Sequence, residues 1–298
     1  MDIKQYLNNR RQEVEQALEE LLPATQGPLA GHVEAMRYSL LAGGKRIRPI
    51  LCLAAAETLP ADSRPLLPVA AALECIHTYS LIHDDLPAMD DDHLRRGMPT
   101  CHKKFGEAAA ILAGDGLLSF AFELLSRPLA GGNISAQEQL RLVHNLATAV
   151  GPAGMVGGQV LDIQAEGRGE QNGLNQLRLI HRCKTGALIT AAVQSGAIGG
   201  GADGRQYEAL TRYGEQIGLA FQIIDDLLNV TGDAATLGKA AGSDTARGKA
   251  TYPALLGLDE TRRQADEAVS AAIAALEIFD QHAEPLRELA RYIATRKN

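Results

Sequence analysis

The chain has 298 residues, which is enough for one large domain or two smaller ones and for a sizeable buried core. Hydrophobic residues make up 46% and charged residues 22% of it, as in ordinary water-soluble globular proteins, while aromatic residues reach only 4%, which argues against a β-rich fold. The formal net charge of −7 argues against a nucleic-acid partner, because binding to nucleic acid requires a basic face.

The four cysteines, Cys52, Cys75, Cys101 and Cys183, are far apart and form no C-x-x-C pair. Neither a zinc site nor a disulfide framework is therefore expected, and reduced thiols indicate a cytoplasmic protein. Residues 1–6 lack the apolar core of a signal peptide. No uninterrupted apolar stretch reaches about 18 residues, so no membrane span is expected.

Helical periodicity dominates the chain. We predict helices at residues 3–22, 31–42, 49–59, 67–86, 107–127, 136–149, 153–166, 174–198, 204–230, 251–257, 259–279 and 283–296. Pro87 ends or kinks the helix before it, and Ser135 followed by Glu138 forms a capping box for the helix 136–149. No strand pattern of useful length and no linker rich in Gly, Ser or Pro is present, so we predict one all-α domain spanning residues 1–298.

An acidic cluster overlaps the end of the predicted helix 67–86. Its members are Asp84, Asp85, Asp90, Asp91 and Asp92. Carboxylates this close repel one another, and the first two stand at a helix C-terminus, where the helix dipole disfavours anions. Hard oxygen ligands in this number suit Mg²⁺ better than Zn²⁺. A solvated acidic loop is the simpler alternative, but the two arginines that follow at positions 95 and 96 favour a site for a diphosphate.

A second acidic pair lies on the predicted helix 204–230. Gln222, Asp225, Asp226 and Asn229 are spaced i, i+3, i+4 and i+7, so they form one polar stripe on an otherwise apolar helix. A single stripe of this kind also suits an internal hydrogen-bond network. Two acidic stripes that face each other across a cavity would instead form a multi-metal clamp for a diphosphate, which is the interpretation we favour.

A basic loop at residues 43–49 (GGKRIRP) joins two predicted helices. Its glycines permit close backbone approach and its Lys and Arg side chains supply charge, but it lacks the G-x-x-x-x-G-K pattern of a phosphate loop. Beside two acidic sites we interpret it as a second diphosphate pocket without metal. His77 shares a helix face with Asp84, seven residues later, although a lone histidine on an apolar helix is usually a packed core residue.

Five motifs in this order make the chain resemble the trans-isoprenyl diphosphate synthases, most closely the bacterial farnesyl diphosphate synthases. The motifs are residues 43–49, Asp84-Asp85 with Asp90, Arg95-Arg96-Gly97, Lys184-Thr185, and Phe221-Gln222 with Asp225-Asp226. The resemblance covers nearly the whole chain, from about residue 28 to the C-terminus. It implies an all-α fold around a deep central cavity and a homodimer.

The resemblance also implies the reaction. An allylic diphosphate (dimethylallyl or geranyl) ionises, the double bond of isopentenyl diphosphate attacks the cation, and a proton is lost to the leaving diphosphate. Carried over by position, the ligands of Mg²⁺ on the allylic diphosphate would be Asp84, Asp85, Asp90 and Asp225. The groups that bind the same leaving group would be Arg95, Lys184 and Lys239, and Lys249 would be a further cation for substrate binding. Isopentenyl diphosphate would be held by Lys45, Arg48, His77 and Arg96. Dipoles for the allylic cation would come from Lys184, Thr185 and Gln222.

The product length is expected to depend on residues just before the first acidic motif. Tyr79 lies roughly 7.5 Å before Asp84 along the helix, and Ser80 is too small to act as a barrier. In the family, a large aromatic residue here accompanies the farnesyl product, and smaller residues accompany geranylgeranyl or longer products. We therefore expect (2E,6E)-farnesyl diphosphate, with geranylgeranyl diphosphate as the alternative and simple packing as the other interpretation of Tyr79.

The chain departs from the family pattern at one position, and its residues leave two alternative functions open. Asn229 stands where the family usually has a third aspartate, which removes one charge from the second motif. His83-Asp84 is similar to the pair found in all-α metal-dependent phosphohydrolases, but those sites need further histidines and none flanks the second acidic pair. A catalytically silent subunit that binds a partner synthase would be expected to lose an acidic motif, and both are present.

Overall fold

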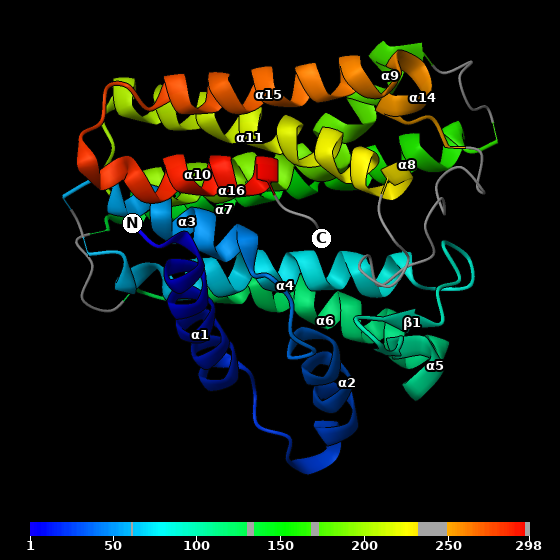
Figure 1. Ribbon diagram of the computed structural model, residues 1–298. Coiled ribbons are helices and arrows are strands. Elements are labelled where there is room, and N and C mark those ends of the chain that lie inside the picture. The colour runs from blue at the N-terminus through cyan, green and yellow to red at the C-terminus, as the bar shows by residue number, and fades with distance from the viewer. Residues whose placement is uncertain (61, 130–133, 168–172, 232–248, 296–298) are drawn as a thin grey trace.

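The computed structural model describes residues 1–60, 62–129, 134–167, 173–231 and 249–295 and shows an all-α bundle (Figure 1). The helices are α1 Ile3–Leu21, α2 Ala30–Leu40, α3 Ile47–Glu57, α4 Leu67–Asp84, α5 Cys101–Phe105, α6 Glu107–Ser126, α7 Ala136–Val150, α8 Met155–Ala165, α9 Gly173–His181, α10 Ala187–Gly199, α11 Gly204–Thr231, α14 Tyr252–Leu256, α15 Leu258–Ala275 and α16 Glu284–Thr295. In Figure 1, α11 and α15 lie on the upper side and α4 and α6 on the lower side, with α3, α7 and α10 between them.

The central helix of the bundle is α10, which packs against α3, α7 and α11. Leu188, Ile189, Val193 and Ile198 point to different sides of this helix, and all four are buried. A helix that is apolar all round has no favourable exposed face, so it is stable only when other helices cover it. The all-α bundle predicted from the periodicity is therefore confirmed.

The fourth helix ends at the acidic cluster, as predicted. α4 finishes at Asp84, with Asp85 as its C-terminal cap, two residues before the predicted end. The backbone N–H of Asp90 then donates to the carbonyl of Asp84 at 2.8 Å, so the chain after Pro87 folds back onto the helix end. This turn brings the carboxylates of the first motif together.

The segment after the acidic cluster contains a hairpin that the sequence did not predict. β1 (Leu94–Arg95) pairs antiparallel with β2 (Met98–Pro99), and these are the only strands in the part of the chain that the structure describes. Arg96 and Gly97 between them both have positive φ, the geometry of a tight two-residue hairpin turn. Strands of two residues are too short to show alternation, which is why the pattern gave no signal. The short helix α5 also escaped prediction.

The predicted helix 174–198 is interrupted. α9 and α10 are joined by a single π-helical turn, Arg182–Gly186, which contains the Lys184-Thr185 motif. π-turns inside α-helices are rare and often occur at functional sites, because they redirect side chains that a regular helix would place elsewhere.

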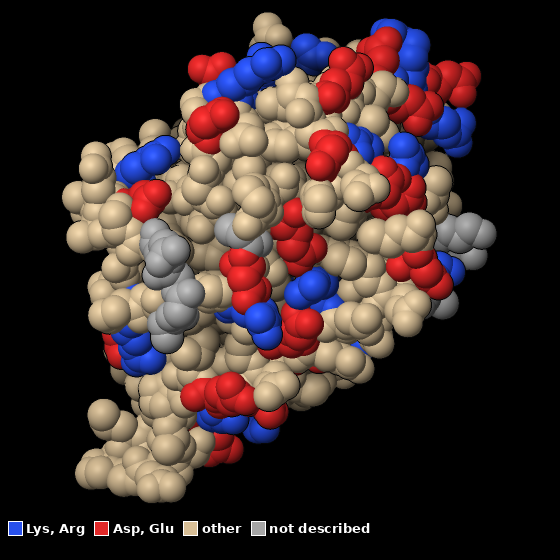
Figure 2. All heavy atoms as spheres, turned by 90° about the vertical axis from the view of Figure 1, so that its left-hand side faces the viewer, with Lys and Arg blue, Asp and Glu red and all other residues tan. Residues whose placement is uncertain are grey.

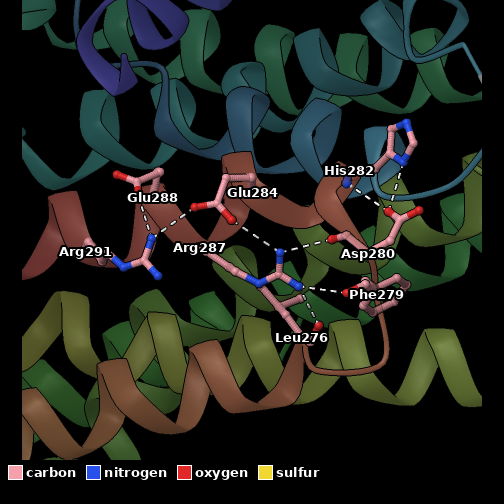
Figure 3. Close-up of polar contacts among 8 residues, drawn as sticks. All are labelled: Leu276, Phe279, Asp280, His282, Glu284, Arg287, Glu288 and Arg291. Carbon is pink, nitrogen blue, oxygen red and sulfur yellow. Dashed lines mark hydrogen bonds and ion pairs between the residues drawn. The ribbon is translucent and has the colours of Figure 1, made fainter. Parts of the chain in front are cut away.

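Two polar arrangements fix helix ends. The predicted capping box is confirmed: the backbone N–H of Glu138 donates to Ser135 Oγ at 3.2 Å, and that of Ser135 donates to a Glu138 carboxylate oxygen at 2.7 Å. After α15, the Arg287 guanidinium donates to backbone carbonyls of the connection to α16 (Figure 3). These carbonyls lie beyond the regular bonding of α15, where those of Leu276 and Asp280 each accept one backbone N–H group of the connection, and the guanidinium supplies a further donor.

Two segments, Arg64–Asp84 and Glu107–Ser126, are long and apolar enough to cross a membrane by length and composition alone. In this structure α4 and α6 pack against each other, and 67% of the most apolar 18-residue window of the first segment is buried in the bundle. Core helices of globular proteins have the same composition, so the two helices are only weak evidence for a membrane span.

Candidate active site

A cavity of about 660 Å³ lies between α4, α8, α11 and the π-turn. It brings together most of the predicted site residues, which come from distant parts of the sequence. Those that line it are Lys45, Arg48, His77, Arg95, Arg96, Lys184, Thr185, Gln222, Asp225 and Lys249. Tyr79 and Ser80 do not line this cavity, and Lys239 lies outside the described residues. The cavity carries charges of both signs, so it is suited to anionic ligands that arrive with cations.

The first acidic motif lies beside this cavity, and its aspartates have two different environments. Burial raises the pKa of the Asp84 carboxyl above its usual value; the Lys184 ammonium opposes this shift and the Asp90 carboxyl adds to it. Asp84 and Asp90 are thus close to each other and to a cation in the cavity wall. Asp85 is buried and accepts hydrogen bonds from Arg95 at 2.8 and 2.5 Å. This bidentate ion pair attaches the hairpin to the end of α4.

The donors present fit Mg²⁺ rather than a metal held by protein alone. Among the described residues, no three His, Cys, Asp or Glu side chains converge closely enough to hold a metal ion by themselves. Burial and, to a lesser extent, the Asp90 carboxyl raise the pKa of Asp84, and a bound cation would favour its ionised form; carboxylates are hard oxygen ligands. Mg²⁺ commonly takes only one or two protein carboxylates and completes its coordination with phosphate oxygens and water.

Arg48 and His77 also line the cavity and have the donors that a second anion site requires. Burial lowers the pKa of His77 well below its usual range, and the Arg48 and Arg96 guanidinium groups lower it further. His77 is therefore neutral near pH 7 and supplies one N–H donor without charge. Arg48 Nε is buried and has no hydrogen-bond partner among the described residues, which suits a donor that awaits a ligand.

Contacts of Arg46 and Arg96 hold the basic loop in shape, and the approach of Arg96 requires a glycine. Arg46 is buried with φ of 50°, donates to Glu74 on α4 at 2.7 Å, and donates to the Leu40 carbonyl at 2.8 Å. The Arg96 guanidinium donates to the Gly43 carbonyl, and a Cβ added at Gly44 would lie 2.7 Å from that guanidinium. The expected close approach to the glycines is confirmed, and the approaching group is Arg96.

The two aspartates of the second acidic stripe also have different environments. Asp225 is exposed at the cavity, which the half-buried Gln222 and Asn229 also line. Asp226 is buried, and its Oδ2 accepts the backbone N–H of Tyr252 at 2.9 Å, which holds the start of α14 against α11. Both aspartates line the cavity, but Asp225 is exposed there and Asp226 is almost fully buried.

Asp162 is a site residue that the motifs did not identify. It lies on α8, lines the cavity, and accepts hydrogen bonds from Lys184 Nζ at 2.7 Å and Lys249 Nζ at 2.9 Å. The sequence offers only one weak indication that Asp162 is a site residue: it is the only charged residue between positions 153 and 165. Its partners lie 22 and 87 residues away, so no local pattern could connect them.

The two residues proposed to control product length lie on other faces of α4. Tyr79 is only 6% exposed, and its ring packs edge-on against His83 with the centroids 5.6 Å apart. His83 in turn contacts the Ile111 carbonyl on α6 at 3.0 Å. The Ser80 hydroxyl donates to the His77 carbonyl within α4. His83 therefore links the buried Tyr79 ring to α6.

The chain is similar to known proteins over its whole length. The polyprenyl synthetase family model matches residues 32–286. A farnesyl diphosphate synthase of Geobacillus stearothermophilus is 47% identical over 99% of this chain and 98% of its own. The large subunit 1 of a chloroplastic heterodimeric geranylgeranyl pyrophosphate synthase of Arabidopsis thaliana is also 47% identical, over 100% of this chain and 80% of its own. A solved FPP/GFPP synthase from Zymomonas mobilis superposes with a TM-score of 0.86 at 40% identity, covering 99% of each chain. The chain belongs to the polyprenyl synthetase family and is a prenyltransferase.

Proposed function

We propose that the protein condenses an allylic diphosphate with isopentenyl diphosphate to give (2E,6E)-farnesyl diphosphate and diphosphate. The observation that carries this proposal is the presence of two separate cationic groups in one cavity. Lys45, Arg48 and Arg96 lie on the side of the basic loop, and Lys184 and Lys249 lie on the side of α8. Two diphosphates can therefore bind at once, as a condensation requires.

The allylic half of the reaction requires stabilisation of a leaving diphosphate. Lys184 and Lys249, with Arg95, would place positive charge beside it, and charges fixed in advance lower the barrier to heterolysis. Mg²⁺ bound by Asp84, Asp85, Asp90 and Asp225 would supply Lewis-acid charge to the same group. The site needs no protein nucleophile.

The allylic cation must be stabilised and kept from water. Thr185 and Gln222 line the cavity and would direct their oxygen dipoles at the cation. Leu81, Leu177 and Phe221 also line it and would exclude water that could trap the cation. The leaving diphosphate is the base that accepts the final proton.

Arg48 is proposed to serve isopentenyl diphosphate rather than the allylic substrate. Arg48→Ala is expected to raise the KM for isopentenyl diphosphate several-fold while the KM for geranyl diphosphate stays nearly unchanged, because the variant removes one donor from the metal-free pocket. Lys184→Ala should affect the allylic substrate instead and is the reciprocal control. Steady-state kinetics with each substrate varied in turn measure both effects. Equal changes in both KM values would show that the two pockets are assigned wrongly.

The farnesyl product is supported by Tyr79, whose buried ring lies one and a half turns before Asp84 and is held by His83. The alternative is geranylgeranyl diphosphate, because the similar proteins carry both names. A His-Asp phosphohydrolase is less well supported. His83 contacts α6 at Ile111, and the described residues hold no cluster of three metal-binding side chains.

The proposed assembly is a cytoplasmic homodimer of one-domain chains spanning residues 1–298. Ile111 and Leu112 on α6 are 44% and 57% exposed, which suits an interface with a second copy. Light scattering after size-exclusion chromatography is expected to give the mass of two chains, and a single-chain mass would contradict the dimer.

The four free cysteines suit a reducing compartment. Figure 2 shows acidic and basic side chains interspersed on one face, which does not favour a nucleic-acid partner there.

The decisive experiment supplies geranyl diphosphate, isopentenyl diphosphate and Mg²⁺ and identifies products by mass spectrometry. Farnesyl diphosphate is the expected product, and EDTA should abolish its formation. Release of phosphate without elongation would support the phosphohydrolase. No turnover would support a catalytically silent subunit that requires a partner synthase.

A further inference from the structure

One carboxylate holds both lysines on the allylic side of the cavity. Lys184 Nζ and Lys249 Nζ donate to the same oxygen, Asp162 Oδ2, at 2.7 and 2.9 Å. The side chains of all three residues are largely enclosed, with 14% of Asp162, 26% of Lys184 and 15% of Lys249 exposed. Burial alone would raise the pKa of the Asp162 carboxyl, but the two ammonium groups lower it below its usual value. Asp162 is therefore ionised and paired with both lysines.

Asp162 reaches the two lysines because α8 packs closely against the π-turn. A Cβ added at Gly158 would lie 2.2 Å from the backbone nitrogen of Lys184, so only glycine lets α8 approach the π-turn. Asp162 is four residues later on the same helix and therefore on the same face. The π-turn and α8 thus meet where the carboxylate can reach the lysine that the turn presents.

We propose that Asp162 is a positioning residue that holds Lys184 and Lys249 together as a preformed pair of donors for the allylic diphosphate. Each ammonium group has three hydrogens, and one bond to Asp162 leaves others for a ligand. Without the carboxylate, two like charges would repel each other at a separation of a few ångströms. The proposal rests on the proposed function, because the diphosphate is the ligand that the lysines serve.

Asp162→Asn is expected to separate catalysis from binding. Its kcat should fall by about tenfold or more, because misplaced charges stabilise the departing diphosphate less well. Binding of inorganic diphosphate in EDTA, measured by calorimetry, should be at least as tight as in the wild type, because the lysines no longer share their charge with a carboxylate. Asp162→Glu should restore most of the lost kcat. A merely structural role would weaken both properties together, and that result would overturn the proposal, as would an unchanged kcat.

Glu166→Gln is the matched control. Glu166 lies 3.3 Å from Lys249 but is 40% exposed, so its contact is screened by solvent and kinetics should stay near wild type. If Glu166→Gln lowered kcat as much as Asp162→Asn does, any nearby charge would have the same effect, and this result would contradict the proposal.

Wild-type protein provides a test that does not depend on the folding of variants. ¹H–¹⁵N NMR of lysine ammonium groups, assigned with Lys184→Arg and Lys249→Arg, should show two ordered signals before ligand is added. Both should shift with inorganic diphosphate. Absence of ordered signals would overturn the preformed pair. Failure of the wild type to elongate prenyl chains would instead contradict the proposed function, and these binding measurements would still report on Asp162.

Discussion

Asp84→Asn and Asp225→Ala are each expected to lower turnover by at least about a hundredfold, the scale of losing one electrostatic stabiliser of a transition state. Asp84 lies beside Asp90 and Lys184 at the end of α4, and Asp225 faces the cavity from α11. Asp84→Asn removes the negative charge of a proposed Mg²⁺ ligand and Asp225→Ala removes a proposed ligand altogether, and neither change opens a cavity in the apolar core. Single-turnover kinetics at saturating Mg²⁺ and substrates measure the effect on the chemical step.

The control for Asp84→Asn is Asp91→Asn, which makes the same change in the loop that follows α4. Asp91 is exposed and has a φ of 47°, a conformation that asparagine also tolerates. Its turnover should stay close to that of the wild type. Near-normal turnover of Asp84→Asn, or full activity of the wild type in EDTA, would contradict the metal site.

Tyr79→Ala is expected to shift the product from farnesyl toward geranylgeranyl diphosphate. The ring is buried about one and a half turns before Asp84 and packs edge-on against His83, so its removal leaves a void on the path that we propose for the growing chain. The void should also lower the free energy of unfolding by about 3 kcal/mol. Chromatography of the dephosphorylated products, with thermal unfolding recorded on the same protein, measures both effects.

Tyr79→Phe separates the two consequences of that change. It keeps the ring and removes only the hydroxyl, so product length should not change. A folded Tyr79→Ala protein that still stops at farnesyl diphosphate would assign Tyr79 to packing between α4 and α6, and the barrier would lie elsewhere.

The helices were predictable because their signals are local. Pro87 and the acidic cluster set the end of α4 to within two residues, and the Ser135 capping box begins α7 as predicted. The hairpin and the π-turn were not predictable. Two-residue strands have no measurable period, and the π-turn depends on tertiary packing: α8 contacts its backbone at Gly158. Periodicity therefore predicts where helices are better than how they are interrupted.

The site was predictable where several charged residues are adjacent in sequence. Lys45, Arg48, Lys184 and Asp225 belong to such motifs and do line one cavity. Asp162 escaped because a single acidic residue on an apolar helix indicates nothing without its distant partners. Motifs also did not reveal the different orientations of adjacent aspartates: Asp85 pairs with Arg95 and Asp226 holds α14.

The crowded carboxylates at the end of α4 link the stability of the protein to its ionic surroundings. Burial, the Asp90 carboxyl and the C-terminal end of α4 all disfavour the ionised Asp84, and a bound cation would relieve that cost. A ligand that binds only the folded state raises the free energy of unfolding by RT ln(1 + [L]/Kd), about 2.7 kcal/mol at a hundred times Kd. The supply of Mg²⁺ and prenyl diphosphates would then set the lifetime of the protein against proteolysis as well as its rate. A cell short of substrate would hold a less durable enzyme.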